Sequence, residues 1–150
     1  MDLRQLTPKL FVSPQIVKSD VAEIAAQGFS NIVNNRPDGE GQDQPDSLHI
    51  LTACSDQGVH YRYIPVVGGA ITEKDILEFR EALDSAQGRA LAFCRTGTRS
   101  TKLWALSHTD IHEPHELISI AAQAGYDIKD LKPVLDARRQ QYFGGNYVQA

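Results

Sequence analysis

Apolar residues along this chain fall into two alternating patterns. Short runs rich in apolar and β-branched residues are typical of buried strands. Between them, apolar positions recur every three or four residues, as on a helix with one buried face. The predicted strands cover residues 10–13, 30–34, 59–66 and 91–93. The predicted helices cover residues 20–27, 46–56, 73–86, 100–108, 116–123 and 128–141. Strands that alternate with helices predict an α/β fold, with a central, mostly parallel sheet flanked by helices.

Capping residues and prolines mark the ends of several predicted elements. Thr72 and Asp75 have the spacing of a capping box ahead of an apolar helical pattern. Pro114 begins a later helix, and Pro133 either interrupts or begins the last one. The pattern therefore predicts a helical C-terminal part, followed by a loose tail at residues 144–150.

The composition limits the classes of function. A chain of 150 residues is long enough for a sizeable core and is predicted to form one domain over residues 1–150. Lys and Arg number 15 against 19 Asp and Glu, and the net charge of −4 argues against a nucleic-acid partner. No apolar run approaches the roughly 20 residues that cross a membrane, and the N-terminus lacks the apolar core of a signal peptide. We therefore expect a cytoplasmic protein with no membrane partner, whose oligomeric state the sequence leaves open.

The two cysteines, Cys54 and Cys94, lie far apart in the sequence. Neither they nor the five histidines have a spacing typical of metal ligands, so no metal or cofactor is expected. Cys54 lies on the apolar face of a predicted helix and is expected in the core. Cys94 directly follows a predicted strand, and a thiol there would stay reduced in the cytoplasm.

The residues after the last predicted strand carry the candidate chemistry. Residues 94–100 read Cys-Arg-Thr-Gly-Thr-Arg-Ser and lead into a predicted helix. In a strand–loop–helix turn, backbone N–H groups and the helix N-terminus face one small space, which suits an oxyanion. The same groups would favour the thiolate form of a cysteine at that position. We therefore predict a nucleophilic cysteine that faces an anion-binding loop.

Cleavage of a phosphate ester would give each residue of this loop a role. The Cys94 thiolate would attack phosphorus, and the Arg99 guanidinium would bind two oxygens. Ser100 or Thr101 would ease the departure of sulfur in the second step, and we assign this role to Ser100. The predicted substrate-binding residues are Arg95, Thr96, Gly97, Thr98 and, from an earlier loop, Arg36. Arg36 could instead be a structural support for its own loop.

A general acid would protonate the leaving group. Asp38, Glu40 and Asp43 follow the strand at residues 30–34, so they should lie at the same edge of the sheet as Cys94 and are possible donors. Asp38 and Asp43 are our candidates for the acid, and the alternative is that all three are solvated loop residues.

These residues resemble the signature of the cysteine-dependent protein tyrosine phosphatase superfamily in its dual-specificity branch, Cys-x-x-Gly-x-x-Arg-Ser/Thr. Cys94, Gly97 and the Arg99–Ser100 pair carry the resemblance, and residues 32–40 are similar to the opening of atypical members. Residues 3–110 most resemble the bacterial phosphatase-like domain found alone or attached to β-lactamase-hydrolase-like metallo-enzymes. The resemblance implies a dual-specificity-phosphatase fold and hydrolysis through a thiophosphate intermediate. The partner would be a phosphorylated protein or a small phosphate ester.

The chain departs from the phosphatase signature at three places. Four residues separate Cys94 from Arg99 where the family has five, Phe93 replaces the usual histidine, and Gly68–Gly69 stands where an aspartate is usual. The shorter loop is also similar to the active loop of single-domain rhodaneses, whose cysteine carries a sulfane sulfur. Two alternatives to the phosphatase therefore remain, a sulfurtransferase and a catalytically weak phosphate-binding module.

Overall fold

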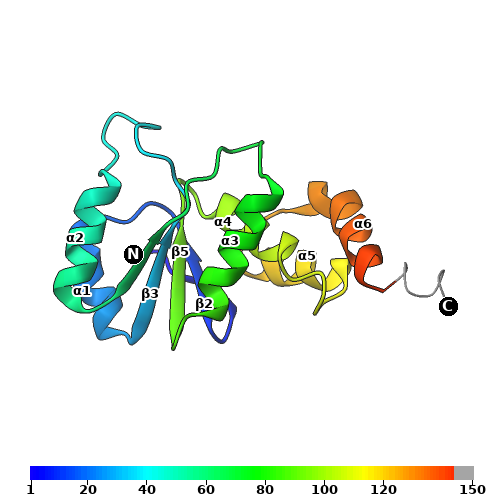
Figure 1. The fold of residues 1–150 in the computed structure, drawn as a ribbon, viewed down its shortest axis with the longest axis horizontal. Coiled ribbons are helices and arrows are strands. Elements are labelled where there is room, and N and C mark those ends of the chain that lie inside the picture. Colours follow the sequence, from blue (N-terminus) through cyan, green and yellow to red (C-terminus); the bar gives the residue numbers. More distant parts are fainter. Residues whose placement is uncertain (144–150) are drawn as a thin grey trace.

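The computed structural model describes residues 1–143, which contain a five-stranded sheet with helices on both faces (Figure 1). The strands are β1 (Arg4–Thr7), β2 (Leu10–Ser13), β3 (Phe29–Asn34), β4 (His60–Tyr63) and β5 (Arg89–Phe93). Their order across the sheet is β1-β2-β5-β3-β4. β1 pairs with β2 in the antiparallel direction, and all the other pairs are parallel. β5, the strand that leads to Cys94, is therefore the central one.

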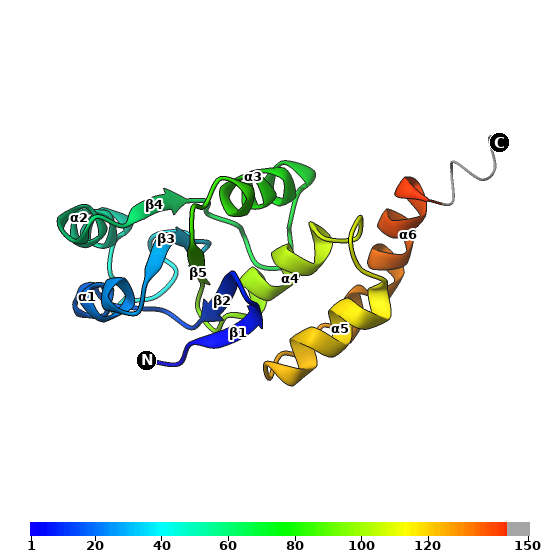
Figure 2. The same ribbon diagram turned by 90° about the horizontal axis from the view of Figure 1, so that it is seen from below.

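The helices divide between the two faces of the sheet (Figure 2). Their bounds are α1 (Lys18–Ala26), α2 (Ser47–Gln57), α3 (Glu73–Asp84), α4 (Thr98–Leu106), α5 (Pro114–Gln123), the 3-10 helix η1 (Lys129–Leu131) and α6 (Lys132–Tyr142). α1 and α2 cover one face, and α3 and α4 cover the other. α5 and α6 pack outside α4, as a third layer. Among residues 1–143, no helix is long and apolar enough to span a membrane.

Each face of the sheet buries its own apolar cluster. Leu91 and Phe93 of β5 pack with α1 and α2, whereas Ala90 and Ala92 face α3 and α4, as the alternation of side chains along a strand requires. The small alanines leave room for Trp104, which is fully buried. Because β5 is covered on both faces, the loop that begins at Cys94 starts from a rigid position.

The predicted fold class is confirmed, and three details differ. The sequence pattern missed β1, a four-residue edge strand with only one buried position, which gives little periodic signal. β4 ends at Tyr63 rather than at residue 66, because the N–H groups of Ile64 and Val66 donate to two consecutive carbonyls, those of Asn34 and Asn35, which breaks the regular parallel ladder. The last helix begins at Lys132 with Pro133 in its first turn, after a separate 3-10 turn. The predicted loose tail at residues 144–150 lies outside the described residues.

Candidate active site

The segment from Cys94 to Gly97 joins the carboxyl end of β5 to the first turn of α4. Ligands commonly bind at this edge of a parallel sheet. Gly97 precedes the helix with φ +98°, a left-handed conformation that glycine adopts without steric cost. A Cβ at this position would also lie 2.7 Å from Cζ of Tyr126 and closer still to its hydroxyl. Both the backbone conformation and the packing therefore require glycine at this position.

Cys94 lines a cavity of about 210 Å³. The cavity is lined by Gly68, Gly69, Ile71, Cys94, Arg95, Thr96, Thr98, Arg99 and Lys102. The Cys94 side chain is almost fully buried, and its Sγ accepts a hydrogen bond from the Gly97 N–H at 3.1 Å. A backbone donor and the N-terminus of α4 therefore act on the same sulfur, and both stabilise negative charge there. We name this cavity the Cys94 pocket.

Arg99 is held in place by an acidic residue and by backbone carbonyls. Its Nη1 donates to Oε2 of Glu40 at 2.9 Å and to the carbonyl of Val66 at 3.0 Å. Glu40 also accepts a bond from Nε of Arg36 at 3.1 Å. Partial burial alone would raise the pKa of Glu40, but the bonds and charges of Arg99 and Arg36 outweigh it and lower that pKa. Glu40 is therefore ionised at neutral pH and fixes the guanidinium beside the pocket.

Ser100 bonds to Asn35 through its hydroxyl, whereas its expected role requires a contact with the Cys94 sulfur. Its hydroxyl is fully buried and donates to Oδ1 of Asn35 at 2.9 Å, and Asn35 donates in turn to the carbonyl of Ile64 at 3.0 Å. The hydroxyl of the next residue, Thr101, donates to the carbonyl of Gly97 at 2.8 Å. Both hydroxyls thus connect α4 to the surrounding loops, and Ser100 is directed at Asn35 rather than at the sulfur.

The structure places Arg36, Asp38 and Asp43 away from the Cys94 pocket. Arg36 is buried and donates to Glu40 and to Oε1 of Gln15, so it supports the loop. Asp38 accepts a hydrogen bond at 2.8 Å from the backbone N–H of Ser47, the first residue of α2. Asp43 is exposed on the same loop. All three side chains follow β3 as predicted, but none of them lines the pocket, which this loop reaches through Glu40 and its contact with Arg99.

The residues that line the Cys94 pocket include no aspartate or glutamate. Within residues 1–143, no three His, Cys, Asp or Glu side chains are grouped so that they could hold a metal ion. The chemistry that the pocket offers is therefore a thiol, backbone N–H groups and cationic side chains.

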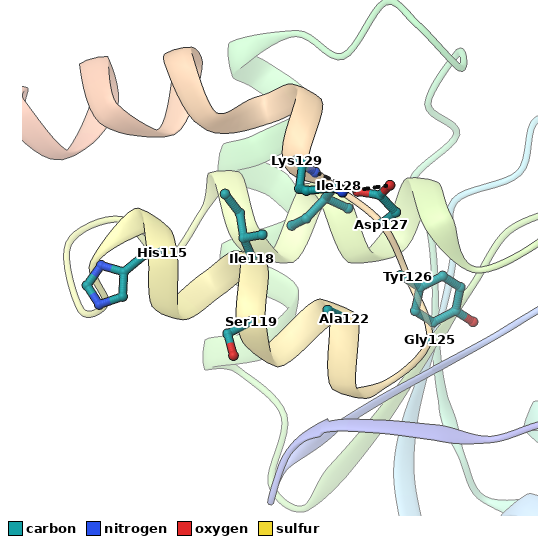
Figure 3. A pocket seen from close by; sticks show the side chains of 9 residues that line it. All are labelled: His115, Ile118, Ser119, Ala122, Gly125, Tyr126, Asp127, Ile128 and Lys129. Atoms are coloured by element: carbon teal, nitrogen blue, oxygen red, sulfur yellow. Dashed lines mark hydrogen bonds and ion pairs between the residues drawn. The ribbon is translucent and has the colours of Figure 1, made fainter.

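Sequence reasoning missed Tyr126, which supports the reactive loop. Tyr126 follows α5 and donates its hydroxyl to the carbonyl of Thr96 at 3.2 Å. Burial raises the pKa of Tyr126, so the hydroxyl keeps the proton that it donates. The Tyr126 ring stands at one end of a second cavity, of about 480 Å³, between α5 and residues 125–129, with its hydroxyl directed away from α5 (Figure 3). No local pattern could have indicated this contact, because it spans 30 residues.

A thiol loop between the central strand and a helix, on this sheet order, defines the class of cysteine-dependent protein tyrosine and dual-specificity phosphatase folds. The solved structure of PTPMT1 superposes with a TM-score of 0.72 over 99% of both chains at 14% identity, which shows the shared fold. Residues 2–111 match the model of the family described as "Beta-lactamase hydrolase-like protein, phosphatase-like domain". The chain belongs to that family, as its resemblance to it predicted.

Relatives in two bacteria agree with this membership. The Beta-lactamase hydrolase-like protein of Agrobacterium fabrum strain C58 is 37% identical over 102 residues, which are 68% of this chain and 24% of that protein. This chain thus spans about a quarter of the length of that curated relative. The solved structure of NMA1982 from Neisseria meningitidis Z2491 is 34% identical, with a TM-score of 0.84 over 93% of this chain and 99% of that one.

Proposed function

We propose that this protein is a cysteine-dependent phosphatase that hydrolyses phosphate monoesters through a thiophosphate intermediate on Cys94. One observation carries the proposal: the Gly97 N–H donates to the Cys94 sulfur at the N-terminus of α4, and the Arg99 guanidinium lines the same pocket. This arrangement supplies a nucleophile and an anion site together.

The reaction would proceed in two displacements. The Cys94 thiolate attacks phosphorus, an S–P bond forms, and the P–O bond to the leaving group breaks. A water molecule then attacks phosphorus, the S–P bond breaks, and inorganic phosphate leaves with the thiolate restored. Arg99 and the backbone N–H groups of residues 95–99 would bind the phosphoryl oxygens, whose charge is present throughout. Glu40 would act as a positioning residue, because it contacts Arg99 and not the substrate.

Sulfur transfer is the second candidate function, and one observation favours it. The loop from Cys94 to Arg99 has the shorter, rhodanese-like spacing, and sulfur transfer needs no acid to protonate a leaving alkoxide. Two assays on the same preparation separate the candidates: hydrolysis of an aryl phosphate, and thiocyanate formation from thiosulfate and cyanide. Aryl phosphate turnover supports the phosphatase, and thiocyanate formation alone would replace it with a sulfurtransferase. Phosphate binding with neither activity would favour the weak binding module.

The leaving-group dependence tests the candidate acids. With no carboxylate lining the pocket, we expect the enzyme to hydrolyse aryl phosphates much faster than alkyl phosphates, whose alkoxides need a proton. Asp38→Asn and Asp43→Asn should each change the ratio of the two rates by less than about twofold, since loss of a true general acid costs about 10²–10⁴-fold. A selective loss of alkyl phosphate hydrolysis in either variant would assign the acid to that residue.

Alkylation should distinguish the two cysteines. Burial raises the pKa of Cys54 to about 12, so its thiol stays neutral at pH 7.5. Only the thiolate is nucleophilic, and we expect iodoacetamide to label Cys94 and spare Cys54 in the folded protein, as read by peptide mass spectrometry. Inorganic phosphate should protect Cys94, and urea should expose both thiols as the control. Equal labelling of the two cysteines without denaturant would contradict the assignment.

A further inference from the structure

The Cys94 pocket contains a cation that the proposed reaction does not use. Lys102 lines the pocket from α4, four residues after Thr98 and three after Arg99. Residues at these spacings share one face of a helix. Lys102 therefore stands about one helical turn, roughly 5.4 Å, beyond the first turn that would bind the scissile phosphate. Its side chain is 27% exposed, so its charge is accessible from the pocket.

Lys102 forms an ion pair with a carboxylate from another part of the chain. The Lys102 Nζ lies 3.1 Å from Oδ2 of Asp130, which belongs to η1 in the C-terminal helical part. The Asp130 side chain is 65% exposed. An ion pair with one partner so exposed is held weakly, so another anion can replace the carboxylate at little cost.

The pocket has more cationic side chains than one phosphate group needs, although Glu40 pairs with Arg99 and Asp130 pairs with Lys102. Three of its lining residues are cationic (Arg95, Arg99 and Lys102) and none is acidic, although the whole chain carries a net charge of −4. Arg99 and the loop N–H groups suffice for the phosphoryl oxygens. Arg95 is exposed at the pocket, and Lys102 stands a turn away. Arg95 can therefore contact a further negative group, and Lys102 can do so once the exposed Asp130 carboxylate is displaced.

We infer that Lys102, with Asp130 as its resting counter-ion, forms a second anion site beside Cys94, so that the preferred substrate is a small phosphate ester with a second phosphate or carboxylate group. The assignment of the first group rests on the proposed phosphatase function. The cavity of about 210 Å³ is smaller than the roughly 300–1,000 Å³ of typical ligand pockets, which favours a compact dianionic ligand. Such a ligand would displace Asp130 and bridge the loop and Lys102.

Three phosphonates that cannot be hydrolysed test this inference by titration calorimetry on the whole protein. Ethylphosphonate carries one anionic group, 3-phosphonopropionate adds a carboxylate, and 1,2-ethylenebisphosphonate adds a second phosphonate. We expect one or both doubly anionic ligands to bind about tenfold more tightly than ethylphosphonate, the size of one additional charge-assisted hydrogen bond. Tighter binding of both means that any anion serves, whereas tighter binding of the bisphosphonate alone restricts the second group to phosphate. Equal affinity for all three ligands would overturn the inference.

Variants of the ion pair locate the effect. Lys102→Met should remove the tenfold preference and change the affinity for ethylphosphonate by less than about twofold. Asp130→Asn should strengthen binding of the doubly anionic ligands by about threefold, because no carboxylate then competes. The pair formed by Lys132 and Asp136 on α6, at 2.8 Å, is the matched control, and Lys132→Met and Asp136→Asn should leave all affinities unchanged. A preference that survives Lys102→Met would overturn the inference.

The binding measurement is independent of turnover. If the protein fails to hydrolyse any aryl phosphate but keeps the Lys102-dependent preference, the phosphatase proposal fails and the second anion site stands. If hydrolysis occurs but the preference is absent, the second anion site fails and the phosphatase stands.

Discussion

Replacing Cys94 with serine is expected to reduce the rate of aryl phosphate hydrolysis by about 10⁴-fold or more, the order of loss seen when a catalytic nucleophile is removed. Serine keeps nearly the same volume in a side chain that is almost fully buried, so the fold should be retained. The hydroxyl, however, stays protonated at neutral pH, and no described side chain in the pocket is a base that could activate it. The measurement is kcat/KM with an aryl phosphate, alongside a thermal melt.

Cys54→Ser is the matched control for that variant. Cys54 is equally buried but lies on α2, among apolar side chains on the far face of the sheet. Cys54→Ser should lower the melting temperature, because it buries an additional polar group, and should leave kcat/KM unchanged. Phosphatase turnover that survives Cys94→Ser would exclude the thiophosphate mechanism. A thiocyanate-forming activity that Cys94→Ser abolishes, with no phosphatase activity in the wild type, would assign the cysteine to sulfur transfer.

Gly97→Ala is expected to have the second largest effect, a decrease of about 10²-fold in kcat/KM. A displacement of roughly 1 Å in an active site can cause a loss of this size. The added Cβ would lie 2.7 Å from Cζ of Tyr126, so either the loop or the ring must move. Movement of the loop withdraws the Gly97 N–H from the Cys94 sulfur, which it contacts at 3.1 Å. The melting temperature should also fall, because alanine is strained at φ +98°.

Gly58→Ala separates the backbone strain from the clash. Gly58 also has a positive φ, +70°, but an added Cβ there would meet nothing within 4 Å. This variant should lose roughly 1–2 kcal/mol of stability and no activity. If Gly97→Ala retained full activity, the loop would tolerate a Cβ, and the contact between Tyr126 and the loop would not be required for catalysis.

The fold and the reactive loop could largely be predicted from the sequence. Hydrophobic periodicity is a local property, and it located β2, β3, β5 and the helices because each must present an apolar side to a neighbour. The order Cys-Arg-Thr-Gly-Thr-Arg-Ser after a buried strand likewise predicted the thiol, the glycine turn and the arginine in one loop. β1 was not predicted, because an edge strand of four residues has too few positions for hydrophobic periodicity to appear.

The partners of the loop were decided only by the tertiary structure. Asp38 and Glu40 lie two residues apart in one polar loop, yet Asp38 is bonded at the start of α2 and Glu40 at Arg99. The local sequence pattern predicts neither of these two contacts, because both depend on the direction in which the loop leaves β3. Tyr126, which follows α5, contacts the loop, and Asp130 of η1 contacts Lys102; both contacts join residues about 30 positions apart.

The sequence by itself therefore determined which residue could be the nucleophile and where in the chain the anion-binding loop lies, since both follow from short-range order. The tertiary structure alone decided what surrounds that loop: the glutamate that holds Arg99, the tyrosine beside Gly97, and the aspartate that pairs with Lys102. The physical reason is that hydrogen bonds and ion pairs between distant segments form only where packing of the core brings them within about 3 Å.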